Sequence, residues 1–172
     1  MNIQRRKTRR IFIGSVPIGN EAPIAVQSMT NTDTSDVEAT VRQIRRLERA
    51  GCEIIRVGVP DIDAARGLNS IKKRIRIPLV ADIHFDHRLA LEALRQGAGG
   101  LRLNPGNIGS HVKVREVTRA AAERGVPIRI GVNSGSVEKK LLQNDFRGIQ
   151  LRAFHEDHIS VLLLRALLEL SG

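Results

Sequence analysis

Short apolar segments alternate with amphipathic stretches along this chain at a regular spacing. The five apolar segments begin at residues 24, 54, 79, 101 and 128, which gives spacings of 30, 25, 22 and 27 residues. The segments are Ile24–Val26, Ile54–Val59, Leu79–Ile83, Leu101–Asn104 and Ile128–Asn133. This spacing fits a repeating strand–loop–helix–loop unit, so the pattern predicts a parallel sheet covered by helices.

The stretches between the strands carry helix start and stop signals. Ser35 and Glu38 have the spacing of a capping box, and Gly51 ends the helix that follows. The next three helices are predicted to begin at Asp61, Asp86 and Ser110. Ahead of the repeats, Ile11–Ile13 and Val16–Ile18 flank Gly14 and Ser15, which predicts a β-hairpin.

Two architectures suit strands that alternate with helices: a (β/α)₈ barrel and an open doubly wound sheet. No strand is followed by the G-x-G-x-x-G turn of dinucleotide-binding folds. Polar residues inside the strands favour the barrel, whose chemistry lies at the carboxyl ends of its strands. Because about five units are present and a barrel needs eight, the sequence predicts an incomplete TIM-barrel type α/β fold with an N-terminal hairpin.

Polar side chains share one phase of the strands, since residues two apart lie on the same face. They are Arg56, Asp82, His84, Arg102, Asn104, Arg129 and Asn133. Outward-facing polar groups would lie beneath the helices at a cost, so these residues are expected to face the barrel mouth. Three arginines against one carboxylate indicate a site for a multiply charged anion such as a phosphate ester. The alternative is a set of ion pairs that fills the barrel interior.

Two further features lie near this phase. Residues 105–110 form a glycine-containing loop that opens a helix, where backbone N–H groups favour an anion. Asp82 and His84 could act as an acid/base pair or as metal ligands, but a hydrogen-bonded histidine explains the pattern nearly as well, and no metal is assigned.

Charge and composition narrow the classes of partner. The net charge is +10, from 28 Lys+Arg and 18 Asp+Glu, which favours anionic partners. The densest basic cluster, residues 5–10, is expected to be a solvated arm. Aromatic residues make up 2% of the chain, so a protein that stacks nucleic-acid bases is not expected.

The single cysteine, Cys52, can form no internal disulfide and cannot hold an iron–sulfur cluster alone. No apolar run is long enough to cross a bilayer, and the N-terminus lacks the apolar core of a secretory signal. A cytoplasmic location is therefore expected, without membrane association.

Four motifs in order resemble 4-hydroxy-3-methylbut-2-enyl diphosphate synthase, a bacterial enzyme family of the non-mevalonate isoprenoid pathway. The motifs are Pro23–Thr32, Val80–Asp86, Leu101–Gly109 and Pro127–Asn133, and the resemblance covers roughly residues 3–142. It implies a (β/α)₈ barrel followed by an iron–sulfur domain. It also implies reductive ring opening of 2-C-methyl-D-erythritol 2,4-cyclodiphosphate, with two electrons delivered through a [4Fe-4S] cluster from flavodoxin or ferredoxin. The family resemblance further implies a homodimer, and the seven polar residues above match the substrate-binding mouth.

The resemblance weakens after Leu142. We therefore expect a partial barrel over residues 1–142 and a divergent, helical tail over residues 143–172. The cysteines of the cluster domain are absent, so the hypothesis is a truncated or frameshifted, inactive product. Two other readings stay open: another phosphate- or pterin-binding barrel enzyme, and a basic nucleic-acid-binding protein.

Overall fold

A computed structural model describes residues 8–131 of the chain. Seven strands occur in this part: β1 (Ile11–Ile13), β2 (Val16–Ile18), β3 (Gln27–Met29), β4 (Ile54–Gly58), β5 (Leu79–Ile83), β6 (Gly100–Leu103) and β7 (Ile128–Ile130). The helices are α1 (Val37–Arg49), α2 (Ile62–Lys72), α3 (His87–Arg95), α4 (Pro105–Ile108) and α5 (His111–Glu123). Among the described residues, no helix is both long and apolar enough to cross a membrane.

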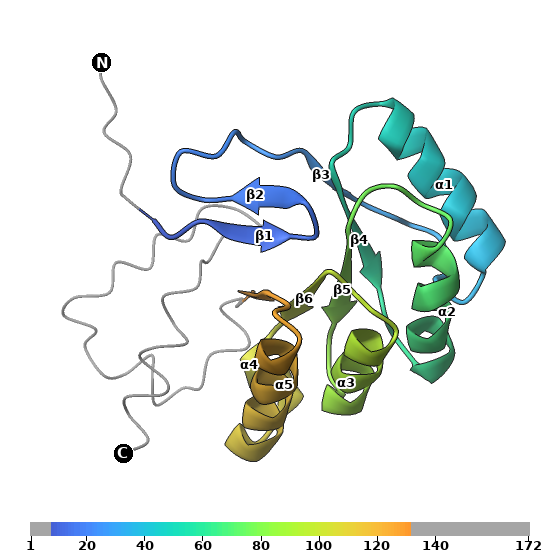
Figure 1. Ribbon diagram of the computed structural model, residues 1–172. Coiled ribbons are helices and arrows are strands. Elements are labelled where there is room, and N and C mark those ends of the chain that lie inside the picture. The colour runs from blue at the N-terminus through green and yellow to red at the C-terminus, as the bar shows by residue number, and fades with distance from the viewer. Residues whose placement is uncertain (1–7, 132–172) are drawn as a thin grey trace.

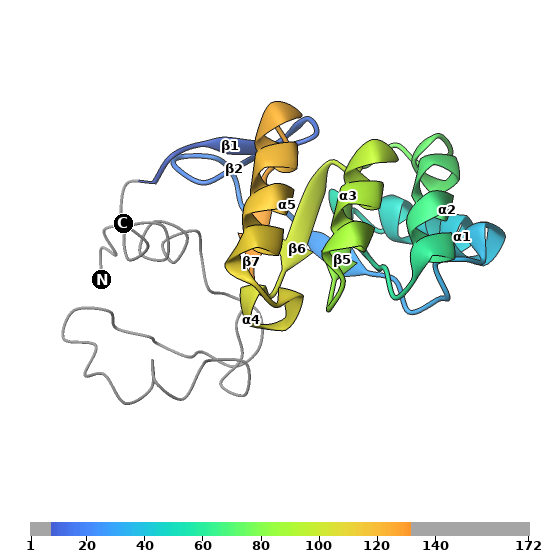
Figure 2. The same ribbon diagram turned by 90° about the horizontal axis from the view of Figure 1, so that it is seen from below.

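Strands β3 to β7 form one parallel sheet whose order follows the chain, β3-β4-β5-β6-β7. The long helices α1, α2, α3 and α5 lie in a row along one side of this sheet (Figures 1 and 2). Sequential parallel strands with helices on one outer side are the arrangement of a (β/α) barrel wall. The predicted fold class is therefore confirmed, with five of the barrel's strands in the described part.

The core lies between the helices and the outer face of the sheet. Ile55, Val57, Ala81, Ile83 and Leu101 all have less than 2% of their surface exposed. They pack in one cluster with apolar residues of the helices, including Val41, Ile44, Ala65, Leu68 and Val117. Because alternate strand residues supply this cluster, the opposite residues of each strand face the inner side.

The helix starts at Asp61, Asp86 and Ser110 are confirmed, and the fourth predicted start, at Ser35, is corrected. Asp61 accepts a hydrogen bond from the Ala64 N–H, and Asp86 accepts one from the Arg88 N–H, each at 2.9 Å. The α1 cap is Asp36 and not Ser35, because the Asp36 carboxylate accepts from the Ala39 N–H at 2.9 Å.

The two residues of the expected capping box have other partners. Ser35 hydrogen-bonds to Asp33 through both its N–H and its hydroxyl. Glu38 pairs with Arg74, which follows the end of α2. The hydrogen bond from Arg74 lowers the pKa of the Glu38 carboxyl. The capping box is therefore absent, and Glu38 instead joins two segments distant in sequence.

The first strand of the sheet begins later than predicted. The strand was expected to begin with the apolar triplet Ile24–Val26, but β3 is Gln27–Met29. Ile24 and Val26 are exposed, and the ladder to β4 begins with Gln27 opposite Ile54. The apolar triplet therefore lies just before the strand, and the ladder starts three residues after Ile24.

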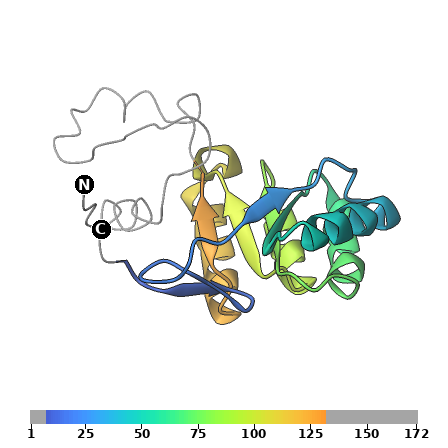
Figure 3. The ribbon, with the colours of Figure 1, turned by 90° about the horizontal axis from the view of Figure 1, so that it is seen from above.

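The predicted hairpin is confirmed, with Ile13 opposite Val16 across the turn. It lies beside the sheet and not within it, close to the amino ends of the strands (Figures 1 and 3). Together with residues of the strand starts it encloses a mainly apolar cavity of about 420 Å³. The hairpin therefore covers the end of the sheet opposite the predicted site.

Candidate substrate site at the carboxyl ends of the strands

The register of the sheet brings the predicted polar residues onto one face. Gly58 lies opposite Asp82, Asp82 opposite Arg102, and Arg102 opposite Arg129. In a parallel sheet such partners point to the same side. Three neighbouring strands therefore present charged side chains next to one another, as the strand phase predicted.

Asp82 is the centre of this cluster. Its carboxylate is buried, with 4% of the side chain exposed, and it lies near three predicted site residues. Arg102 Nη1 donates to Asp82 Oδ1 at 3.1 Å, and Arg56 Nε lies 3.6 Å from Oδ2. His84 Nε2 lies 3.7 Å from Oδ1. Asp82 thus holds two guanidinium groups and an imidazole around one carboxylate.

Two contacts fix the arginine side chains further. Arg56 Nε lies 3.2 Å from Met29 Sδ, across the β3–β4 pair. The Arg102 guanidinium lies directly against Gly131, where an added Cβ would meet Arg102 Nε and Nη2 at 2.7 Å. Because a side chain at residue 131 would displace this guanidinium, glycine there is a spatial requirement of the cluster.

A cavity of about 600 Å³ adjoins the cluster at the same end of the sheet. Three loops line it: the β3–α1 loop with Thr30 to Thr34, the β4–α2 loop with Pro60 and Asp61, and the β5–α3 loop with Phe85. Met29 and His84 also line it, and both contact the charged cluster. Met29 and His84 therefore lie between this cavity and the other charged residues of the cluster.

Five of the seven predicted site residues lie together in this cluster. Arg56, Asp82, His84 and Arg102 are brought into contact, and Arg129 lies beside Arg102 in register. Asp82 forms ion pairs with Arg56 and Arg102. The alternative expectation, ion pairs that fill the barrel interior, is therefore also met in part.

The remaining predicted elements lie next to the cluster or outside the described residues. Asn104 is buried directly after β6, 3% exposed, and Asn133 lies outside the described residues. The segment expected to be a loop after β6 contains the short helix α4, Pro105–Ile108. Gly109 follows it with a φ of 98° before α5 begins.

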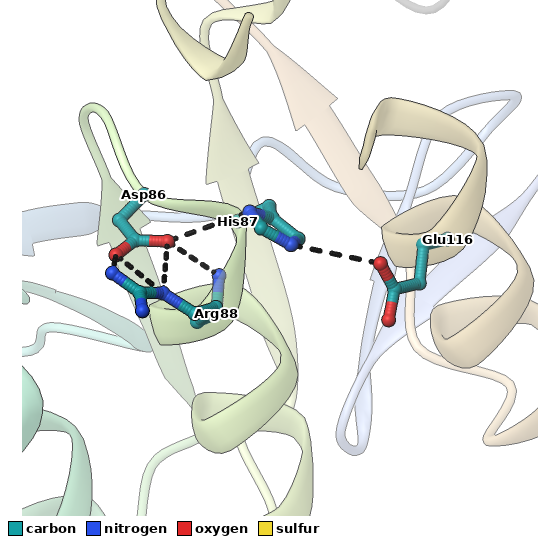
Figure 4. A network of polar contacts seen from close by, with 4 residues as sticks. All are labelled: Asp86, His87, Arg88 and Glu116. Atoms are coloured by element: carbon teal, nitrogen blue, oxygen red, sulfur yellow. Dashed lines mark hydrogen bonds and ion pairs between the residues drawn. The ribbon is translucent and has the colours of Figure 1, made fainter. Parts of the chain in front are cut away.

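A second polar network was not predicted from the sequence. His87 Nδ1 lies 3.4 Å from Asp86 Oδ1, and His87 Nε2 lies 3.6 Å from Glu116 Oε2 (Figure 4). The Arg88 guanidinium binds Asp86 and lowers the pKa of its carboxyl to about 2. Glu116 of α5 lies opposite the start of α3 because the two helices pack against each other. No local signal in the sequence therefore predicts the contact between His87 and Glu116.

Within residues 8–131, no group of three or more His, Cys, Asp and Glu side chains could hold a metal ion. Cys52 is 7% exposed and lies just before β4, at the amino end of the sheet. Its thiol donates to the Ile54 carbonyl at 3.0 Å. The thiol and the arginine cluster therefore lie at opposite ends of the strands.

The basic arm lies only partly within the described residues. Arg9 and Arg10 are exposed, in keeping with the solvated arm that the sequence favours, whereas Arg5, Arg6 and Lys7 lie outside the described residues.

Comparison with known proteins identifies close relatives. The family model described as the GcpE TIM-barrel domain matches residues 8–164, beyond the boundary expected at residue 142. The chain is 63% identical over 141 residues to the 4-hydroxy-3-methylbut-2-en-1-yl diphosphate synthase (flavodoxin) of Thermodesulfovibrio yellowstonii, over 82% of this chain and 40% of that protein. The protein of the same name from Pseudomonas syringae pv. syringae is 62% identical over 139 residues, over 81% and 38% respectively. The chain thus spans about two fifths of the length of these relatives.

Solved structures support the fold alone. Dihydropteroate synthase from Yersinia pestis aligns with a TM-score of 0.54 at 16% identity, over 70% of this chain and 45% of that one. The Xanthomonas albilineans enzyme, solved with 7,8-dihydropteroate, gives 0.53 at 18% identity, over 70% and 49%.

Proposed function

Because the chain belongs to the GcpE TIM-barrel domain family, we propose that it forms the substrate-binding barrel part of a 4-hydroxy-3-methylbut-2-en-1-yl diphosphate synthase. The proposed substrate is 2-C-methyl-D-erythritol 2,4-cyclodiphosphate, as the sequence motifs imply. One observation carries the proposal: Asp82 orients Arg56 and Arg102, from two other strands, at the carboxyl end of the sheet.

The arrangement suits a diphosphate for electrostatic reasons. Asp82 can neutralise one of the two guanidinium groups that it contacts, so the cluster keeps a net positive charge. Guanidinium donors form planar, paired hydrogen bonds with phosphate oxygens, and these bonds are strong in a partly buried site. Arg56 and Arg102 have only 16% and 21% of their side chains exposed. The chain's own contribution is therefore to bind the diphosphate and fix its orientation.

The residues of this chain do not fit a [4Fe-4S] cluster. Such a cluster is held by several cysteine thiolates, and the chain has one cysteine, buried at the far end of the strands. We therefore assign no redox step to these residues, and thiolate ligands would have to come from residues outside this sequence. The electron donor, flavodoxin or ferredoxin, the homodimer and the cytoplasmic location stay predictions.

Calorimetric titration of the cyclodiphosphate into the 172-residue chain tests the proposal. Arg102→Ala removes a charged donor, worth about 1.5–3 kcal/mol, so the affinity is expected to fall by roughly 10- to 150-fold. Arg119→Ala is the matched control, because the Arg119 side chain is 83% exposed on α5 and pairs with Glu123 one turn further along the same helix. The control should bind as the wild type does.

Three outcomes would contradict the proposal. Equal affinities of wild type and Arg102→Ala would remove Arg102 from the site. Binding of a pterin in preference to the cyclodiphosphate would favour another barrel enzyme. RNA binding with a steep salt dependence, lost when residues 1–10 are deleted, would favour the nucleic-acid alternative.

A further inference from the structure

One buried hydroxyl beside the arginine cluster has no hydrogen-bond partner. Thr30 follows β3 directly, and 7% of its surface is exposed. Its N–H continues the sheet by donating to the Arg56 carbonyl at 3.0 Å. Its Oγ1 is buried without a partner among the described residues. A buried hydroxyl without a partner is costly, which makes its position worth explaining.

The neighbouring threonines show that this feature is specific to Thr30. The Thr34 hydroxyl donates to the Gly58 carbonyl at 2.6 Å. Thr32 and Thr40 share a hydrogen bond of 2.8 Å, and Thr40 also donates to the Asp33 carbonyl. These hydroxyls are used to hold the β3–α1 loop in place. Thr30 is held by its backbone instead, so its hydroxyl is available to a ligand.

Thr30 lines the cavity that adjoins the arginines. Met29 and His84 lie on the wall of the same cavity, and they contact Arg56 and Asp82 respectively. Met29 and His84 therefore lie between the arginines and Thr30, and a ligand whose charged end lies at the arginines would reach Thr30 by extending past these two side chains. Bare pyrophosphate has no carbon skeleton to place there, whereas a phosphorylated polyol carries hydroxyl groups that a threonine can bind.

We propose that Thr30 forms a second subsite, in which its hydroxyl binds a hydroxyl on the carbon skeleton of a polyol diphosphate. This inference rests on the proposed function, because it takes the arginine cluster as the subsite for the diphosphate. It divides the work between two parts of the site: the arginines supply most of the affinity, and Thr30 distinguishes a hydroxylated ester from a simple diphosphate. Thr30 is a specificity-determining residue in this arrangement.

Titration of two probes into wild type and Thr30→Val tests the subsite. Valine keeps the shape of threonine but lacks the hydroxyl. For the cyclodiphosphate, Thr30→Val should reduce affinity by roughly 2- to 13-fold, the usual worth of a neutral hydrogen bond. For inorganic pyrophosphate the two proteins should bind equally. Thr30→Ser restores a hydroxyl and should recover most of the loss, whereas Thr118→Val on α5 should bind both probes as the wild type does.

Thermal melting without ligand provides an independent readout. Removing an unpaired buried hydroxyl relieves a desolvation cost, so Thr30→Val should melt at or above the wild-type temperature. Thr34→Val should melt lower, because it leaves the Gly58 carbonyl without its partner. A lower melting temperature for Thr30→Val would show that its hydroxyl is already paired, and would overturn the premise.

The two proposals fail in different ways. If the wild type binds neither probe, the proposed function fails. If it binds both but Thr30→Val binds the cyclodiphosphate as tightly as wild type, the subsite alone is wrong. Equal loss of both probes in Thr30→Val would also overturn the subsite, since Thr30 would then act only by shaping the arginine cluster.

Discussion

Arg102 Nη1 lies 3.1 Å from Asp82 Oδ1, and this ion pair joins β6 to β5 near the carboxyl ends of both strands. Asp82 is almost fully buried, and the same carboxylate lies 3.6 Å from Arg56 of β4. One side chain therefore links three neighbouring strands of the sheet. The pair has a structural role as well as a binding role, because it positions two cations that would otherwise repel each other.

Asp82→Asn should destabilise the fold. Asparagine keeps the shape but removes the charge, which leaves two partly buried guanidinium groups without their counter-ion. We expect the free energy of unfolding to fall by about 1.5–3 kcal/mol, measured by urea denaturation at neutral pH. Glu123→Gln removes the exposed partner of Arg119 and should cost less than about 1 kcal/mol. Equal losses in the two variants would show that burial does not strengthen the Asp82 pairs.

Gly131→Ala should weaken diphosphate binding without removing any charge. The added Cβ would lie 2.7 Å from two nitrogen atoms of Arg102, so the guanidinium must move away from its present position. We expect a roughly tenfold loss of cyclodiphosphate affinity, at the lower end of the effect of Arg102→Ala. Gly99→Ala is the control, because Gly99 lies just before β6 at the opposite end of the sheet and its Cβ would meet nothing closer than 3.5 Å. Wild-type affinity in Gly131→Ala would mean that Arg102 tolerates displacement.

The Asp86–Arg88 contact should contribute to stability above about pH 4 and lose its contribution below it. Arg88 lowers the pKa of the Asp86 carboxyl from 3.8 to about 2, so the folded state binds its proton less readily than the unfolded state. A group with a depressed pKa stabilises the fold above its unfolded pKa and ceases to do so as pH falls through the folded value. Asp86→Asn keeps a residue suited to capping α3 but removes the charge, and with it the pH-dependent contribution to stability.

The check is urea denaturation of wild type and Asp86→Asn at about pH 7 and about pH 2. The wild type should be more stable at neutral pH, and the difference should shrink toward zero in acid. Arg88→Gln should show the same pattern, because it removes the other partner. A difference that persists unchanged in acid would assign the effect to capping and not to charge.

The sequence predicted the inner face of the sheet because side-chain alternation is fixed by backbone geometry. Arg56, Asp82 and Arg102 share a face for this reason alone. The predicted start of β3 was wrong because apolar composition does not determine where the ladder to β4 begins, which is at Gln27 opposite Ile54. The predicted cap of α1 was wrong because Ser35 and Asp36 are both good capping residues, and the local backbone conformation decides between them.

The contacts between side chains could not be predicted from the sequence. The contacts of one carboxylate with two arginines depend on side-chain conformations. The loop around Thr30 decides that its hydroxyl, unlike those of the neighbouring threonines, has no partner among the described residues. Thr30 lies within a motif that carried the family resemblance, so its position was marked although its role was not. The contact between His87 and Glu116 could not be predicted either, because it requires α3 and α5 to be packed together.

Reconstitution with iron and sulfide should leave the chain without a cluster. Cys52 is buried, its thiol is hydrogen-bonded to Ile54, and it lies at the end of the sheet away from the arginines. Anaerobic incubation followed by iron analysis and electron paramagnetic resonance should give the same low signal in wild type and in Cys52→Ala. About four iron atoms per chain, lost in Cys52→Ala, would show that this thiol can take part in a [4Fe-4S] site.

Gly14→Ala should separate the backbone cost of the hairpin turn from its contact with the sheet. Gly14 has a φ of 57°, and an added Cβ would lie 2.8 Å from Pro78 Cβ, just before β5. Gly125 has a similar φ of 63°, but its Cβ would meet nothing within 4 Å. Both alanine variants pay the cost of a left-handed conformation, about 1–2 kcal/mol, whereas only Gly14→Ala also forces the hairpin away from Pro78. We expect urea denaturation to show an additional loss of about 1–3 kcal/mol for Gly14→Ala, as for an overpacked contact. Equal losses would mean that the hairpin is not pressed against the sheet, and that the apolar cavity beneath it is open.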